Sequence, residues 1–241
     1  MLTIRDLVVQ FGGVRAIDSL SVTVPDVALV GVIGPNGAGK STLLNAVTGT
    51  IRPQAGTIHL GDTELTGRSQ VAIARSGIGR TWQAGRLFPS LTVAENVMIG
   101  AHRYRRRSEA AAQVAMWVDR LMLGSVQNRM VGELPLGQRR RTVLARALVG
   151  RPQVLLLDEP FAGMQRAEKA ELAAVVRELA ETEDSQVVLI EHDVRLVMET
   201  VQHLIVMRRG SLLADGTPES VAADAAVQEE YLGSIYQKET A

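Results

Sequence analysis

Residues 34–42 read Gly-Pro-Asn-Gly-Ala-Gly-Lys-Ser-Thr and match the pattern G-x-x-x-x-G-K-[ST] at every fixed position. The stretch follows an apolar run, 27–33, that is typical of a buried strand. It precedes Leu43, Leu44 and Val47, which are spaced as one face of a helix. Strand, loop and helix in this order are the context that the pattern requires, so the sequence predicts a P-loop that binds the phosphates of a nucleotide. A glycine-rich turn without chemical meaning would leave these flanks unexplained.

The residue types of this loop suit an anionic ligand. Its glycines let the backbone curl with the N–H groups pointing inward, and the following helix adds positive potential at its N-terminus. Lys40 can reach the β- and γ-phosphates, and the hydroxyl of Ser41 can ligate Mg²⁺. We therefore expect all residues of the loop to contact ATP: Gly34, Pro35, Asn36, Gly37, Ala38, Gly39, Lys40, Ser41 and Thr42.

Amino-acid composition limits the classes of protein to which the chain can belong. The chain has 241 residues, 46% of them hydrophobic, which is enough for one large domain or two small lobes. Lys and Arg number 26 and so do Asp and Glu, a balance that argues against a nucleic-acid partner. The absence of cysteine excludes disulfides and thiolate metal sites. Neither a long apolar span nor the features of a signal peptide occur, so the sequence predicts a cytoplasmic location.

The order of the predicted elements indicates an α/β fold. An antiparallel β part is expected at the N-terminus, around the turn at Gly12 and Gly13. Strands then alternate with helices, which favours a mainly parallel core sheet. Between residues 91 and 150 the chain is almost all helix, with Ser108 expected to cap one of these helices. We therefore predict a nucleotide-binding core over 1–90 and 151–241, with a helical lobe inserted at 91–150.

A second motif places two acids at the end of a strand. Residues 154–160 read Val-Leu-Leu-Leu-Asp-Glu-Pro, an apolar run that ends in Asp158 and Glu159. If this strand lies beside the P-loop strand, Asp158 can serve Mg²⁺, and Glu159 can polarise the attacking water as a general base. Solvated acids at a strand end are the ordinary alternative. The P-loop in the same chain argues against that alternative.

Three further residues fit the same site. Gln83 carries an amide that can ligate Mg²⁺ or orient water, and His192, after an apolar strand, can contact the γ-phosphate. Phe11 stands before a glycine turn and can stack on adenine. Each residue alone has an ordinary explanation: an exposed loop glutamine, a capping histidine and a core phenylalanine. Their order along the chain, together with the two motifs, indicates that they belong to one nucleotide site.

In this order the motifs resemble the ATP-binding subunit of ABC transporters, and the resemblance covers essentially the whole chain. Residues 34–42 match the family's Walker A motif, Gln83 its Q-loop, and Val154–Glu159 its Walker B motif with the catalytic glutamate. His192 matches the switch histidine and Phe11 the adenine-stacking aromatic residue. Several stretches are similar to the LivG-type subunit of the branched-chain amino acid branch: 11–17, 80–83, 87–96, 190–198 and 231–233.

This resemblance implies partners as well as an activity. Such subunits form homo- or heterodimers in which each ATP lies between the P-loop of one subunit and the signature motif of the other. Hydrolysis drives a separate integral membrane permease. A solute-binding protein delivers the solute to that permease. The chain is therefore expected to be an ATPase that energises uptake of branched-chain or related amino acids, peripheral to the cytoplasmic face of the cell membrane. The alternatives are a soluble non-transport ABC-type ATPase and a low-turnover nucleotide-binding regulatory module.

The signature motif departs from the family pattern. Leu-Ser-Gly-Gly-Gln falls on Leu134, Pro135, Leu136, Gly137 and Gln138. The usual serine donates its hydroxyl and its backbone N–H to ATP across the dimer, and Pro135 has neither donor. A lost charge-assisted hydrogen bond costs about 1.5–3 kcal/mol, which is roughly ten- to a hundredfold. We therefore hypothesise that this subunit hydrolyses ATP at its own P-loop with an intact signature from a different partner. Its own signature would then serve a weaker site.

The stretch that follows Gln83 carries two large apolar residues. Leu87 and Phe88 fall in a predicted loop, where exposure to water is unfavourable. A short helix of the permease that docks there would bury them. The alternative is that Phe88 packs into the helical lobe.

Overall fold

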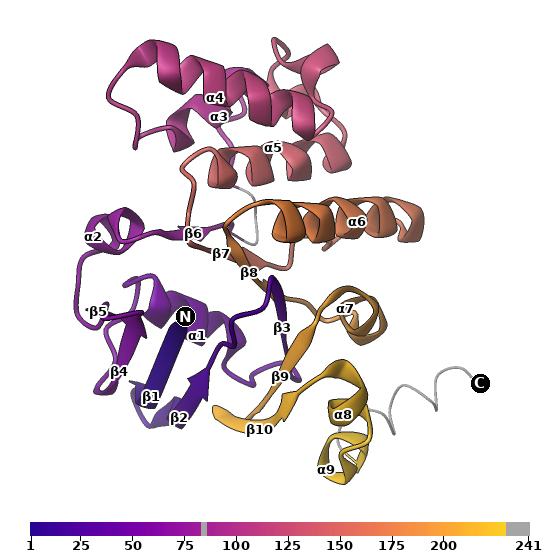
Figure 1. Ribbon diagram of the computed structural model, residues 1–241. Coiled ribbons are helices and arrows are strands. Elements are labelled where there is room, and N and C mark those ends of the chain that lie inside the picture. The colour runs from indigo at the N-terminus through magenta and orange to yellow at the C-terminus, as the bar shows by residue number, and fades with distance from the viewer. Residues whose placement is uncertain (83–85, 230–241) are drawn as a thin grey trace. The chain divides into compact units, whose positions relative to one another are not determined.

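The computed structural model describes residues 1–82 and 86–229 (Figure 1). The chain forms two compact units, one made of two separate stretches of the sequence and the other of a single stretch. The terminal unit consists of Met1–Ser76 and Gln186–Ala241, and the middle unit of Gly77–Ser185. The P-loop therefore belongs to the terminal unit, whereas Asp158 and Glu159 belong to the middle unit.

An antiparallel sheet opens the terminal unit. Its strand order is β2-β1-β4-β5, and β1 pairs antiparallel with both β2 and β4. The inward-facing side chains of β1, such as Leu7 and Val9, are fully buried, because alternate residues of a strand point to opposite faces. The expected antiparallel β part is thus confirmed. The strands are β1 (Leu2–Phe11), β2 (Val14–Thr23), β4 (Ala55–Leu60) and β5 (Thr63–Glu64).

The second set of strands in this unit carries the P-loop. Strand β3 pairs in parallel with β8 on one side and β9 on the other, and β10 adds antiparallel to β9. All residues of β3 are buried, as expected for a parallel strand covered on both faces. The prediction of a mainly parallel core is confirmed. These strands are β3 (Leu29–Ile33), β8 (Gln186–Ile190), β9 (His203–Arg208) and β10 (Ser211–Gly216).

Short helices complete the terminal unit. Helix α1 begins at the P-loop and buries Leu43, Leu44 and Val47, the apolar face that the sequence predicts. The other helices begin at side-chain caps, which satisfy the first backbone N–H groups; Ser69 caps α2, for example. The helices are α1 (Lys40–Val47), α2 (Gln70–Arg75), α7 (Val194–Thr200), α8 (Pro218–Ala222) and α9 (Ala225–Val227).

The middle unit joins one strand pair to a helical part. Strand β6 (Ile78–Arg80) pairs in parallel with β7 (Val154–Asp158), which is buried throughout. The α-helices are α3 (Val93–Gly100), α4 (Arg107–Arg120), α5 (Leu136–Leu148) and α6 (Arg166–Thr182). Two short 3₁₀ turns lie at Gly124–Val126 and Val131–Glu133.

Close packing holds α3 against α5. A β-carbon at Gly100 would lie 1.9 Å from the carbonyl oxygen of Arg146, so only glycine fits where the two helices meet. Trp117 of α4 is fully buried in the same helical part. The prediction that Ser108 caps α4 is wrong, because the helix already begins at Arg107 and its N-cap residue is Arg106. No helix among residues 1–82 and 86–229 is long and apolar enough to cross a membrane.

Candidate functional site

The P-loop turns sharply between β3 and α1. Gly37 and Gly39 have φ angles of 81° and 102°, a left-handed conformation that side chains rarely adopt. Inside the loop the N–H of Ala38 donates to the carbonyl oxygen of Pro35 at 3.1 Å. The N–H of Leu43 donates to the carbonyl oxygen of Gly39 at 2.8 Å, which closes the first turn of α1. The glycines of the motif are therefore required by the backbone itself.

Neighbouring strands hold the loop on two sides. A β-carbon at Gly34 would lie 2.4 Å from the carbonyl oxygen of Met207, and one at Gly39 would lie 2.5 Å from that of Ala16. The N–H of Gly210, in the turn between β9 and β10, donates to the carbonyl oxygen of Ala38 at 2.9 Å. These close approaches fix the curvature of the loop before any ligand binds.

Lys40 lies inside this curve. Its Nζ donates to the carbonyl oxygens of Gly34 and Pro35 at 2.5 and 3.1 Å, and only 6% of the residue is exposed. In contrast, the loop tip is exposed at Pro35, Asn36 and Gly37. A cation enclosed by backbone dipoles behind an exposed loop is suited to bind phosphate groups.

Phe11 and His192 belong to the same unit as the P-loop. Phe11 ends β1 with half of its surface exposed, at 50%, so it is not a core residue. It pairs across the hairpin with Val14, the first residue of β2. The same strand approaches the P-loop, because the carbonyl oxygen of its residue Ala16 faces Gly39. His192 is exposed just after β8, and the capping of α7 is performed by Asp193 instead. Both ordinary explanations, a core phenylalanine and a capping histidine, are therefore wrong.

The two acids of the middle unit differ in environment. Asp158 is the last residue of β7 and is buried, whereas Glu159 follows the strand and is partly exposed. Glu159 has a φ angle of 48°, a left-handed conformation that costs a non-glycine residue about 1–2 kcal/mol. Strain of this kind persists where the surrounding structure imposes it, most often at functional sites.

Asp158 has a partner that sequence reasoning missed. Nη2 of Arg80, at the end of β6, donates to Oδ2 of Asp158 at 2.8 Å. The backbone N–H of Asp158 donates to Oγ1 of Thr81 at 3.2 Å. Within the described ranges, Oδ1 of Asp158 is buried and has no hydrogen-bond partner. The sequence shows little sign of this ion pair, because Arg80 ends a strand of only three residues, which is too short to predict.

The signature stretch starts a helix without a side-chain cap. Pro135 is the N-cap residue of α5, and its side chain accepts no hydrogen bond. Leu134 is buried, while Leu136, Gly137 and Gln138 are partly exposed. A β-carbon at Gly137 would meet no atom closer than 3.7 Å, so packing within this chain does not require glycine there.

Comparison with known proteins decides the family. The sequence model described as ABC transporter matches residues 17–162, which is more than half of the chain. The chain belongs to the ABC transporter family.

Relatives of known name resemble this ABC subunit along its whole length. It is 37% identical to the high-affinity branched-chain amino acid transport ATP-binding protein BraF of Pseudomonas aeruginosa, over 97% of this chain and 98% of that protein. Identity and coverage are the same for the corresponding protein LivG of Escherichia coli K12. Among solved structures, the ADP conformation of an ABC-transporter ATP-binding cassette has a TM-score of 0.85 with 28% identity, covering 97% of this chain and 98% of that one. The α/β fold and the resemblance to the branched-chain amino acid branch are thereby confirmed.

The residues of this ABC subunit suit Mg²⁺ bound to a nucleotide. Mg²⁺ prefers oxygen ligands and usually takes one or two from the protein, the rest from phosphates and water. In the middle unit, Oδ1 of Asp158 is a buried carboxylate oxygen that lacks a hydrogen-bond partner among the described residues. In the terminal unit, Ser41 is an exposed residue that carries a hydroxyl group. The part of the chain that the structure describes holds no group of three or more acidic, histidine or cysteine residues that could bind a metal unaided. Gln83, the other predicted ligand, lies outside the described residues.

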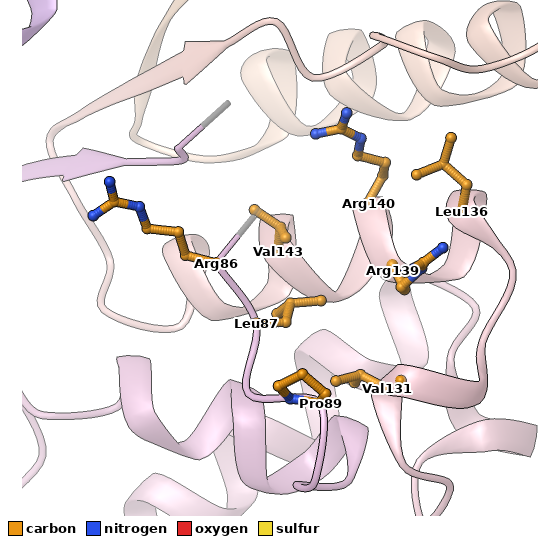
Figure 2. Close-up of a pocket in the computed structure, with 9 residues that line it drawn as sticks. Arg86, Leu87, Pro89, Val131, Leu136, Arg139, Arg140 and Val143 are labelled. Carbon is orange, nitrogen blue, oxygen red and sulfur yellow. The ribbon is translucent and has the colours of Figure 1, made fainter. Parts of the chain in front are cut away.

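A pocket of about 440 Å³ opens in the middle unit beside α5 (Figure 2). The backbone around it is well anchored, because Nη1 of Arg146 donates to the carbonyl oxygen of Arg86 at 2.9 Å. Burial lowers the pKa of Arg146. The lining combines apolar side chains with arginines, drawn from residues 86–89, from the 3₁₀ turn Val131–Glu133 and from α5: Arg86, Leu87, Pro89, Val131, Gly132, Leu136, Arg139, Arg140 and Val143.

Phe88 stands next to this pocket and points outward. Its backbone N–H donates to Oδ1 of the buried Asn96 at 2.9 Å, and Nδ2 of Asn96 donates to its carbonyl oxygen at 3.1 Å. Half of the Phe88 surface, 50%, is nevertheless exposed. The loop is thus fixed while its aromatic side chain remains available to a partner, which argues against simple packing into the helical part.

Proposed function

We propose that this subunit hydrolyses ATP to energise uptake of branched-chain or related amino acids through a separate membrane permease. The observation that carries the proposal is the 37% identity, over 97% of the chain, to proteins named as branched-chain amino acid transport ATP-binding proteins. A P-loop with its lysine enclosed by backbone carbonyl groups and a strained acid after a buried strand support an active ATPase.

Each candidate residue has a role in this proposal. Lys40 and the backbone of residues 34–42 bind the phosphates, and Phe11 stacks on adenine. Ser41, Asp158 and Gln83 hold Mg²⁺, which when bound neutralises phosphate charge. Glu159 accepts the proton of the attacking water, Gln83 helps to orient that water, and His192 contacts the γ-phosphate.

We further propose that the subunit works in a dimer with a second ATP-binding subunit. Residues 134–138 would face the partner's ATP from the helical lobe, which we place at 91–150. The space around Gly137 supports this, because a glycine that its own chain does not require permits close approach of an external ligand. Pro135 offers no donor, so a heterodimer in which the partner supplies an intact signature fits this chain better than a symmetric homodimer.

The permease is proposed to dock at the pocket beside α5. Leu87, Phe88 and Val143 offer apolar contact, and Arg86 and Arg139 add positive charge at the same place. A short cytoplasmic helix of the permease with an apolar face and an acidic residue has the complementary chemistry. Docking of this kind would hold the subunit at the cytoplasmic face of the membrane.

Uptake of radiolabelled leucine tests the proposal directly. The chain, its partner ATPase and its permease are reconstituted in liposomes with a solute-binding protein, and ATP is enclosed on the cytoplasmic side. We expect ATP-dependent uptake that Lys40→Ala reduces at least tenfold, while Lys169→Ala on α6 leaves it unchanged. ATP hydrolysis without association with any permease would support the soluble ATPase instead. Nucleotide binding without turnover would support the regulatory module.

A further inference from the structure

A buried ion pair joins the ends of β6 and β7. Nη2 of Arg80 lies 2.8 Å from Oδ2 of Asp158, and only 6% and 5% of the two side chains are exposed. Arginine side chains carry a positive charge. The carboxylate proposed to serve Mg²⁺ therefore has a permanent cation on one of its oxygens before any nucleotide binds.

The guanidinium group is itself held from a second direction. Cζ of Arg80 lies 4.2 Å from the centroid of the Trp82 ring, in cation–π contact. Thr81, between them, is bound to the neighbouring strand: its N–H donates to the carbonyl oxygen of Leu156 at 2.9 Å, and its Oγ1 accepts from the N–H of Asp158. A planar guanidinium stacked on a ring and bonded to a carboxylate has little freedom to rotate. Oδ2 of Asp158 is therefore fixed in place.

The other oxygen of the same carboxylate is left without a bond. Among the described residues no donor reaches Oδ1 of Asp158, although the atom is buried. A buried acceptor without a partner is unfavourable, and an ion or a water molecule is one of the groups that can satisfy it.

We propose that Arg80 is a positioning residue for the ATPase reaction: it holds Oδ2 of Asp158, so that Oδ1 is the oxygen left for the Mg²⁺ shell. The inference rests on the proposed function, because it assumes that Asp158 serves the metal. Arg80 also offsets the charge of the carboxylate, so that the protein gains orientation of the metal ligand at the expense of metal affinity.

Removing Arg80 should thus act on binding and on turnover in opposite directions. Without the positive charge, the site attracts a divalent cation more strongly, by about tenfold for one charge a few ångströms away in a highly polar medium. Without the bond to Oδ2, the carboxylate loses its fixed orientation and turnover falls. A residue that only stabilised the fold would not increase metal affinity.

The experiment measures Mn²⁺ affinity and turnover separately. Free Mn²⁺ is followed by electron paramagnetic resonance in the presence of the full-length chain and a saturating hydrolysis-resistant ATP analogue. We expect Arg80→Met to bind Mn²⁺ about tenfold more tightly than the wild type, with kcat at saturating Mg²⁺ reduced at least tenfold. Arg80→Lys keeps the charge and should stay within about threefold of the wild-type Mn²⁺ affinity.

Two further variants make the outcome decisive. Arg80→Gln is neutral but can still donate to Oδ2 of Asp158, so it serves if Arg80→Met does not fold, and tighter Mn²⁺ binding is expected again. Arg106 belongs to the same unit and its side chain is exposed, so Arg106→Met removes an arginine charge as a control and should leave Mn²⁺ affinity unchanged. If a folded Arg80→Gln variant binds Mn²⁺ no more tightly than a wild type that itself binds the metal–nucleotide complex, the role of Arg80 is refuted. The proposed function is not affected by that result. A wild type that binds no metal–nucleotide complex would overturn the proposed function too.

Discussion

Gly39 faces the carbonyl oxygen of Ala16 so closely that a β-carbon would lie 2.5 Å from it. This contact joins the P-loop to β2, the strand whose first residue pairs with Phe11. The two ends of the proposed nucleotide site in the terminal unit are therefore connected by one strand. The curvature of the loop depends on the absence of a side chain at this position.

Substituting Gly39 with alanine should disrupt the loop. The φ angle of 102° is strained for alanine and the new β-carbon would collide with backbone, so we expect ATP affinity to fall more than tenfold and Tm to decrease. Gly12→Ala is the matched control, since Gly12 also has a positive φ angle, 56°, but no atom within 4 Å of the added carbon. It should cost only about 1–2 kcal/mol of stability. Equal effects of the two variants, by calorimetry and nucleotide titration, would contradict the close contact.

Restoring serine at position 135 tests the altered signature. Pro135→Ser supplies a hydroxyl and a backbone N–H, so the turnover of a homodimer of this chain should rise about ten- to a hundredfold. The new serine can also cap α5, which adds about 1 kcal/mol to the free energy of unfolding. Steady-state phosphate release is compared in an assembly whose homodimeric state is established by light scattering. An unchanged rate there would show that Pro135 does not limit the site.

Truncating Phe88 should affect coupling without affecting the isolated subunit. Phe88→Ala removes a half-exposed aromatic side chain whose loop is held by Asn96, so the fold should remain intact. We expect ATP hydrolysis by the purified subunit to stay within about twofold, and co-purification with the permease to fall at least tenfold, as for loss of an aromatic anchor. Val71→Ala, an exposed residue on α2, is the control and should leave assembly unchanged. Equal recovery of the permease by both variants would place its contact elsewhere.

A capping box at the start of α3 predicts a pH-dependent contribution to stability. Hydrogen bonds from the backbone and side chain of Thr92 lower the pKa of Glu95. Because the folded pKa lies below the unfolded one, the stabilisation is present above the unfolded pKa and is lost as pH falls through the folded value. Glu95→Gln should therefore be less stable than the wild type at pH 7 in urea titrations, and the difference should vanish at low pH. Glu109→Gln, at an exposed position of α4, should show a smaller difference at pH 7.

Sequence alone predicted the elements that have strong periodic or motif signals. The P-loop, the apolar face of α1 and the buried run of β7 follow from residue pattern, since strand and helix periods differ. Strand β6 has only three residues, two of them Ile78 and Gly79, and gives no such signal. The Arg80–Asp158 pair could not be predicted for the same reason, because it depends on the pairing of β6 with β7.

Local details also depended on tertiary context. Ser108 has the side chain of a helix cap, yet the N-cap of α4 is Arg106, two residues earlier, because the types of residues 106 and 107 do not exclude a helix start. Phe11 could have been a core or a surface residue from its type alone, and only its position at the end of β1 exposes it. Gln83 lies outside the described residues and stays a prediction.

Phosphate release by the Glu159→Gln variant tests the central claim most directly. The variant is assembled with the partner ATPase and the permease, and its ATP turnover and ATP affinity are measured beside those of the wild type and of Glu168→Gln as a control on α6. If this subunit hydrolyses ATP with Glu159 as general base, turnover at its P-loop falls at least a hundredfold while ATP still binds. Turnover retained within a few fold in Glu159→Gln would contradict the account.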